Sequence, residues 1–291
     1  MSAHAMTGAR PGRRVGKDSV LPVAFMFLAS AYFLVPLYWL LVASSKSRAD
    51  LTSTSGLWFS DFNLFSNVSD LFSRDDGIYW RWLANSVLYA GFGAVASTLL
   101  AAMAGYALAK YQFRGREAIF SAVLAGVLVP ATALALPLFL MLSKVSLTNT
   151  YWAVLLPSLV SPFGVYLSRI YAAASVPDEL IEAGRIDGAG EFRIFFTMAT
   201  RLMGPALVTI FLFQFVAIWN NFFLPLIMLV DQKLYPVTLG LFAWSSQASR
   251  DPNLTTAVIV GSLISVIPLI AAFLMLQRYW RSGLGAGGVK G

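Results

Sequence analysis

Six long apolar runs alternate with polar segments along the 291-residue chain. The first run covers residues 20–43, and 24 helical residues rise about 36 Å, enough to cross the hydrocarbon core of a bilayer with some tilt. The pattern therefore predicts an all-α integral membrane protein with six transmembrane helices and both termini on one side. The other five runs cover about residues 83–109, 118–142, 151–171, 205–230 and 254–276.

The polar segments suggest how the chain is organised. The small, polar and basic residues 1–19 predict a disordered cytosolic tail. A basic start before an apolar run also occurs in signal peptides, but this run is too long and lacks an Ala-x-Ala exit, so we expect a retained helix. We expect residues 20–82 to form this helix and an outer loop, residues 83–276 a membrane core, and residues 277–291 a cytosolic tail.

Prolines interrupt the third and fourth apolar runs. Pro130 and Pro137 lie in the third, and Pro157 and Pro162 lie in the fourth. Each proline leaves a backbone carbonyl without its helical partner, so we expect kinked helices that pack against neighbours rather than against lipid alone.

Composition and charge support this interpretation. The chain is 58% hydrophobic and 12% charged, with a net charge of +7, and such a chain cannot cover itself with a polar surface. Its basic residues are scattered at segment ends, which is typical of topology signals and not of a nucleic-acid site. Fourteen Lys and Arg residues lie on the N-terminal side of the membrane and seven on the other, so we expect both termini in the cytosol.

The chain shows no residues for chemistry of its own. It has no cysteine, and its single histidine, His4, lies in the polar tail, so neither a metal site nor a nucleophile–His pair is expected. No phosphate-binding loop occurs. We expect no Asp, Glu, Lys, Arg or His within the six apolar runs. Ion- or proton-coupled transporters, by contrast, usually need an ionisable side chain near the middle of the membrane. Energy for uphill transport would therefore come from another chain.

A polar island, residues 176–205, separates the fourth and fifth runs and carries five of the fourteen carboxylates. Pro177 suits a first helical turn, and Asp178 complements the positive end of a helix. Glu182 and Arg185 continue the polar face at the i+4 and i+7 positions. We expect this short helix to face the cytosol and to dock into a partner's groove, although a solvated loop is the alternative.

The opposite face of this expected helix is apolar. Leu180 and Ile181 lie there, and Gly184 follows one turn later. Residues 187–190, Asp-Gly-Ala-Gly, predict a turn in which glycine takes a positive φ. A second helix is expected over residues 191–203 and leads into the fifth run.

Residues 182–188, Glu-Ala-Gly-Arg-Ile-Asp-Gly, resemble the EAA motif of ABC importer permeases, which runs Glu-Ala-Ala, three residues, Gly. Gly184 replaces the second alanine, and residues 198–201 depart from the Ile-x-Leu-Pro with which the motif continues. Further stretches look like the sugar-importer branch, above all the maltose-type second permease, from about residue 20 to the C-terminus. These are residues 85–86, 106–109, 149–157, 161–164, 219–222, 277–279 and 285–291.

This resemblance implies an ABC type-1 permease fold for residues 83–276 and a place in the cell membrane. It implies four partner chains: a homologous second permease, two copies of a cytosolic ATPase that uses ATP and Mg²⁺, and an extracytoplasmic sugar-binding protein. The chain itself would be non-catalytic, would bind no cofactor, and would help to import a sugar, which we expect to be an oligosaccharide. The residues expected to couple to the ATPase are Asp178, Glu182, Ala183, Gly184, Arg185, Asp187, Gly188 and Ala189.

A solute pathway is expected on the fifth run. Amide side chains and an aromatic stripe on one helix suit a neutral polyol or sugar, which offers hydroxyls and a flat C–H face. Hydrogen bonding between helices and an aromatic membrane belt are the alternatives. The residues are Phe211, Gln214, Phe215, Trp219, Asn220 and Asn221.

Two other functions compete with this one. A self-sufficient carrier or channel would move a neutral solute without a motor, and the uncharged apolar runs disfavour it. A structural membrane scaffold is the third possibility, which copurification with an ATPase would separate from a permease.

Overall fold

A computed structural model gives the fold and describes residues 20–287. The predicted tail of residues 1–19, with His4, lies outside the described residues. Over residues 20–287 the chain is helical and has no β-strand, as expected for an all-α protein. The elements are α1 (Val20–Ser44), α2 (Arg48–Ser53), α3 (Leu64–Ser73), η2 (Arg74–Gly77), α4 (Ile78–Lys110), α5 (Arg116–Val127), α6 (Ala131–Lys144), α7 (Tyr151–Ser158), α8 (Pro162–Ser175), α9 (Asp178–Ile186), α10 (Glu191–Ile194), the π-helical segment η3 (Phe195–Ala199), α11 (Thr200–Leu202), α12 (Gly204–Trp219), α13 (Phe223–Met228), η4 (Gln232–Leu234), α14 (Val237–Gln247) and α15 (Asn253–Gly287).

The helices account for the predicted number of membrane spans. In residues 20–287, four helical stretches are long and apolar enough to cross a bilayer: Val20–Ser44, Leu64–Lys110, Tyr151–Ser175 and Asn253–Gln277. Two bent helix pairs raise the number to six if each pair is one span. The described residues therefore form a multi-pass membrane protein.

The third apolar run bends sharply, as its prolines predicted. Helices α5 and α6 meet at 105°, and Pro130 lies between them as the N-cap of α6, with φ −61° and ψ 130°. A proline cannot continue the hydrogen-bond ladder of the preceding helix, so the chain changes direction there.

The predicted fifth span, residues 205–230, is divided between two helices. Helix α12 ends at Trp219, and α13 begins only at Phe223. The side chains of Asn220 and Asn221 hydrogen-bond to nearby backbone, with Asn220 Nδ2 donating to Val216 O at 2.9 Å. The backbone N–H of Asn221 donates to Ile218 O and so leaves the helical i−4 pattern, and Pro225 has no N–H with which to continue it.

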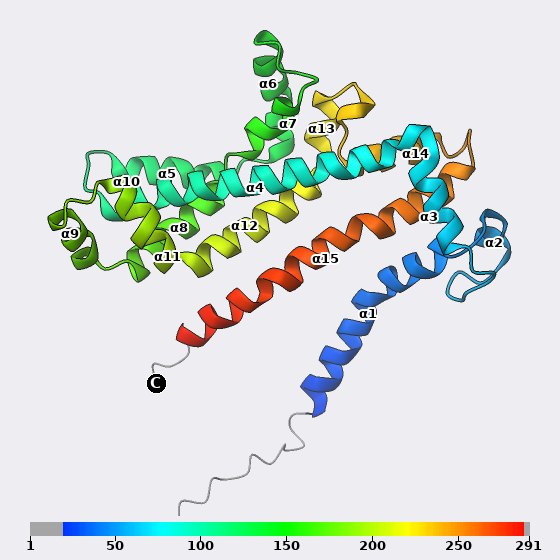
Figure 1. The fold of residues 1–291 in the computed structure, drawn as a ribbon, viewed down its shortest axis with the longest axis horizontal. Helices are drawn as coiled ribbons and strands as arrows, with labels where there is room; N and C mark the ends of the chain where they lie inside the picture. The colour runs from blue at the N-terminus through cyan, green and yellow to red at the C-terminus, as the bar shows by residue number, and fades with distance from the viewer. Residues whose placement is uncertain (1–19, 288–291) are drawn as a thin grey trace, which may run out of the picture.

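Helix α4 is the central element of the bundle. It packs against α8 and α12, and α15 packs against α12, α14, α3 and α1. In Figure 1 α4 runs horizontally, with α9 beyond its left end and α2, α3 and α14 around its right end. We call these the α9 end and the α3 end of the molecule.

Helices α4 and α8 are in close contact at Gly105 of α4. A Cβ atom added there would lie 2.4 Å from Ser168 Cβ and 2.7 Å from the backbone N of Arg169, both on α8. Only glycine permits this separation of the two helices, because any side chain would meet backbone. A small residue at this position thus lets the two helix backbones approach each other closely.

Two buried clusters stabilise the two ends. Near the α3 end Trp82 packs on Trp244, with ring centroids 4.5 Å apart, in a core that also contains Trp219. Near the α9 end Tyr106 packs on Phe195, with centroids 5.2 Å apart, beside Ile194.

Helix α1 stands apart from these clusters. Its residues are exposed or half-buried from Val20 to Leu41, and only its last three, Val42, Ala43 and Ser44, are buried. This apolar surface requires lipid or another membrane protein as its environment. In Figure 1 α1 diverges from the bundle.

Arg169 corrects the expectation that the apolar runs hold no ionisable side chain, because it lies within the run 151–171. It sits six residues before the end of α8, near the α9 end. Its guanidinium donates to Glu117 at 2.6 Å and lies 3.9 Å above the Phe120 ring. Pairing and a cation–π contact make a charge tolerable at the end of a span.

Candidate functional site

Helix α9 (Asp178–Ile186) lies where the sequence predicted a short helix, but it begins one residue later than expected, so Pro177 precedes the first turn instead of belonging to it. Pro177 is its N-cap residue with φ −65°, and Asp178 and Glu179 occupy its first turn. Gly188 follows with φ +75°, a conformation that glycine adopts without strain. The N–H of Ala189 donates to Gly184 O at 2.9 Å, which closes the turn.

The apolar face of α9 is buried against the segment that follows it. Ile181 and Gly184 are buried, and a Cβ at Gly184 would lie 3.1 Å from Ile194 Cγ1 and 3.3 Å from Met198 Sδ. Gly184 therefore allows α9 to lie close to the helix that begins at α10. The buried and exposed faces of α9 agree with the amphipathic pattern.

The opposite face of α9 is open to solvent. Glu182, Ala183, Asp187 and Gly188 are exposed, and Glu182 makes no hydrogen bond or ion pair within the described residues. Ile186 is 86% exposed. It is not among the predicted coupling residues, although an isolated isoleucine on a polar face could have indicated a contact with a partner. An unpaired carboxylate beside an exposed isoleucine can bind a groove with a basic rim.

Asp178 and Arg185 have partners within the chain. Asp178 Oδ1 lies 2.7 Å from Lys110 Nζ at the end of α4, and Arg185 Nε lies 2.7 Å from Glu191 Oε1. The hydroxyl of Tyr111 donates to the other oxygen of Glu191 at 2.5 Å. Asp178 and Arg185 are therefore engaged within the chain, and fewer residues of α9 are available to a partner than the sequence predicted.

The electrostatics of this cluster follow from its hydrogen bonds. The Arg185 guanidinium holds the pKa of Glu191 below its usual value, and the Tyr111 hydroxyl acts in the same direction. Burial raises the pKa of Tyr111, and its bond to Glu191 raises it further. Glu191 thus stays ionised and Tyr111 stays protonated at neutral pH.

A second site is a cavity of about 650 Å³ between α6, α7 and the end of α12. Its polar lining includes the three predicted amides Gln214, Asn220 and Asn221, so the structure brings them together. Gln214 Nε2 donates to Ser97 Oγ at 2.7 Å, which ties α12 to α4. No charged residue lines this cavity, and its remaining walls are mainly apolar.

The predicted aromatic stripe lies elsewhere. Phe211, Phe215 and Trp219 stack successively, with centroids 5.9 and 5.7 Å apart, against the core near the α3 end. Trp219 is buried there. None of the three lines the cavity of the amides, and Phe222 and Phe223 supply its aromatic wall instead.

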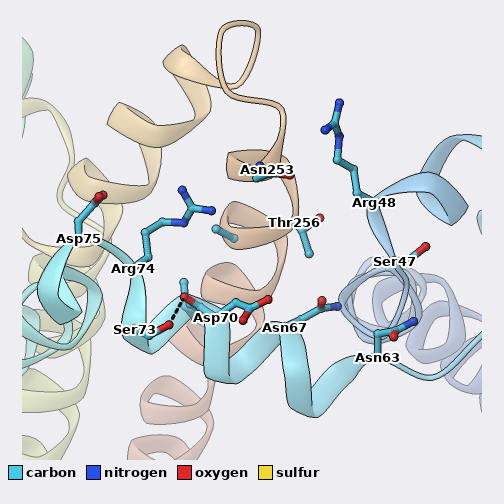
Figure 2. Close-up of a pocket in the computed structure, with 12 residues that line it drawn as sticks. Ser47, Arg48, Asn63, Asn67, Asp70, Ser73, Arg74, Asp75, Asn253 and Thr256 are labelled. Atoms are coloured by element: carbon cyan, nitrogen blue, oxygen red, sulfur yellow. Dashed lines mark hydrogen bonds between the residues drawn. The ribbon is translucent and has the colours of Figure 1, made fainter.

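A polar cavity of about 620 Å³ opens at the α3 end. Figure 2 shows Asp70 and Arg74 on one side of it, and Asn253 and Thr256 of α15 opposite. Arg74 bridges to Asp251 at 3.2 Å, and the Thr256 hydroxyl is buried without a hydrogen-bond partner in the described part of the chain. Its lining comprises Ser47, Arg48, Asn63, Asn67, Asp70, Leu71, Ser73, Arg74, Asp75, Asn253, Thr256 and Ala257.

The described residues contain no candidate metal centre. Within residues 20–287 no group of three or more His, Cys, Asp or Glu side chains could hold a metal ion.

Comparison with known proteins agrees with this picture. Residues 97–284 match the family model described as "Binding-protein-dependent transport system inner membrane component". An arabinooligosaccharide transport system permease, AraQ, of Halalkalibacterium halodurans is 37% identical over 94% of this chain and 96% of its own length. The melibiose/raffinose/stachyose import permease MelC of Bacillus subtilis is 28% identical over 94% of this chain and 96% of its own length.

A solved structure has the same fold. It is a bacterial ABC transporter involved in the import of the acidic polysaccharide alginate, and its similar chain gives a TM-score of 0.79 at 22% identity. The match covers 94% of this chain and all of the other.

Proposed function

Because the chain belongs to the family of binding-protein-dependent transport system inner membrane components, we propose that it is a permease subunit of an ATP-driven oligosaccharide importer. In this role it forms the membrane pathway together with a second permease. It is a non-catalytic transport subunit, and a separate cytosolic ATPase hydrolyses the ATP.

The exposed face of α9 is the observation that carries the proposal. Glu182 and Ile186 are free for a partner, while Ile181 and Gly184 fix the helix to the bundle. A helix held on one face and free on the other suits the helix-in-groove mode of recognition. The coupling surface on the ATPase would then meet residues 182–188.

Oligosaccharides are the solute class that fits best. The names of AraQ and MelC both refer to oligosaccharides, and the cavity lined by Gln214, Asn220 and Asn221 offers neutral hydrogen-bonding groups. Amides can donate to and accept from sugar hydroxyls without the cost of burying a charge. The pathway would pass along this cavity, and the second permease would supply its other wall.

The remaining partners follow from the two ends of the molecule. The α9 end would face the cytosol with both termini, as the excess of Lys and Arg on that side supports. Two ATPase copies would bind there, one on each permease. The polar cavity at the α3 end would face outward, where an extracytoplasmic sugar-binding protein would dock (Figure 2).

Uptake into reconstituted vesicles tests the proposal. We expect ATP-dependent accumulation of an arabinooligosaccharide when the chain is reconstituted with its second permease, its ATPase and its binding protein. Vesicles with this chain alone should show no flux, because the second permease that supplies the other wall of the pathway is absent. Flux through the chain alone would instead support a self-sufficient carrier or channel.

A further inference from the structure

The end of α4 is joined to α9 at two separate points. Lys110, the last residue of α4, pairs with Asp178 at the start of α9. Tyr111, the next residue, bonds to Glu191, and Glu191 pairs with Arg185 in the last turn of α9. Both ends of α9 are thus tied to two consecutive residues of another helix.

We call these contacts, Lys110 with Asp178 and Tyr111 with Glu191, the clamp. Its residues at the end of α4 are held more rigidly than those at α9. The Lys110 side chain is 8% exposed, whereas that of Asp178 is 76% exposed. Tyr111 caps α4, with its N–H donating to Ala107 O at 3.1 Å, and its ring packs edge-on to buried Tyr106. Lys110 and Tyr111 therefore present fixed groups to which α9 attaches.

We propose that Lys110, Tyr111 and Glu191 are positioning residues that make α9 and α4 move as one body during transport. The inference rests on the proposed function, because it assumes that a partner displaces α9. Asp178 and Arg185, which the sequence predicted to meet an external partner, instead hold α9 to its own chain.

The far end of α4 is bonded to the segment 232–235 at the α3 end of the molecule. There Trp82 Nε1 donates to Gln232 O at 2.8 Å, and Asn85 Nδ2 donates to Lys233 O at 2.9 Å and Tyr235 O at 3.0 Å. Helix α4 spans 33 residues, or about 50 Å. A displacement of α9 would thus reach the segment 232–235 at the α3 end through a single continuous helix.

Charge reversal at Lys110 tests the clamp in the complete reconstituted complex. We expect Lys110→Asp to assemble with the ATPase but to transport at least about fivefold less sugar per ATP hydrolysed, since two carboxylates would then face each other. The double variant Lys110→Asp/Asp178→Lys restores the pair in reverse and should return this ratio to within about twofold of the unchanged protein.

Tyr111→Phe provides a milder variant if the charge reversal prevents assembly. It keeps the ring against Tyr106 and removes only the bond to Glu191, so we expect the ratio to fall about two- to tenfold. Unchanged ratios in Tyr111→Phe, or a double variant no better than Lys110→Asp, would overturn the clamp. Absence of ATP-driven uptake by the unchanged complex would instead remove the proposed function itself.

Discussion

Replacing Glu182 by lysine is expected to abolish sugar uptake while the protein remains in the membrane. Glu182 is exposed on α9 and has no partner in the described chain, so a basic groove on the ATPase is its expected contact. Loss of one member of an interfacial charge pair costs about 2–5 kcal/mol, or at least about a thirtyfold loss of affinity. Lysine adds repulsion to that loss.

Insertion should be unaffected, because an added positive charge on the cytosolic side favours the same topology. Copurification of the ATPase and uptake into cells are the two measurements. Asp61→Lys is the matched control for ATPase copurification, since it makes the same charge change at an exposed carboxylate in the loop between α2 and α3, at the end of the molecule away from α9. Normal uptake by Glu182→Lys would remove the coupling role of this residue.

The second large effect is expected at Gly105, the contact between α4 and α8. A Cβ there would lie 2.7 Å from Arg169 N and 2.8 Å from Val165 O, both backbone atoms of α8. Because backbone cannot rotate away, Gly105→Ala should force the two helices apart and cost about 1–3 kcal/mol. Gly105→Leu should prevent a stable fold.

Thermal unfolding in detergent, followed by the loss of monodisperse protein, measures this effect. Gly91→Ala is the control on the same helix, because nothing lies within 4 Å of a Cβ added there. Alanine also has a higher helix propensity than glycine, so Gly91→Ala should be neutral or stabilising. Equal melting temperatures for the two alanine variants would contradict the close packing of α4 on α8.

The sequence predicted the spans better than their breaks. Membrane-length apolar runs are visible without any tertiary information, and Pro130 marked the site of one bend. The 105° angle of that bend depends on packing, which the local sequence does not contain. The end of α12 at Trp219 had a local signal in Asn220 and Asn221, but their position inside an apolar run concealed it.

The candidate site was predictable where it is local. The faces of α9 and the glycine turn at Gly188 follow from spacing within one short segment. The bond between Lys110 and Asp178 joins residues 68 positions apart, so no sequence pattern could indicate it. The aromatic stripe on α12 would have the same helical spacing whether it lined a pathway or packed in the core. Only the residues that pack against it distinguish these two environments.

Labelling of a single cysteine at residue 186 tests the central claim most directly. The chain has no natural cysteine, and Ile186 is 86% exposed on the free face of α9, so Ile186→Cys gives one defined thiol. We expect a membrane-impermeant maleimide to label it in inside-out vesicles but not in intact cells, and the assembled ATPase to block the reaction. Labelling from the outside of intact cells, or labelling that the ATPase leaves unchanged, would contradict a motor that acts through α9.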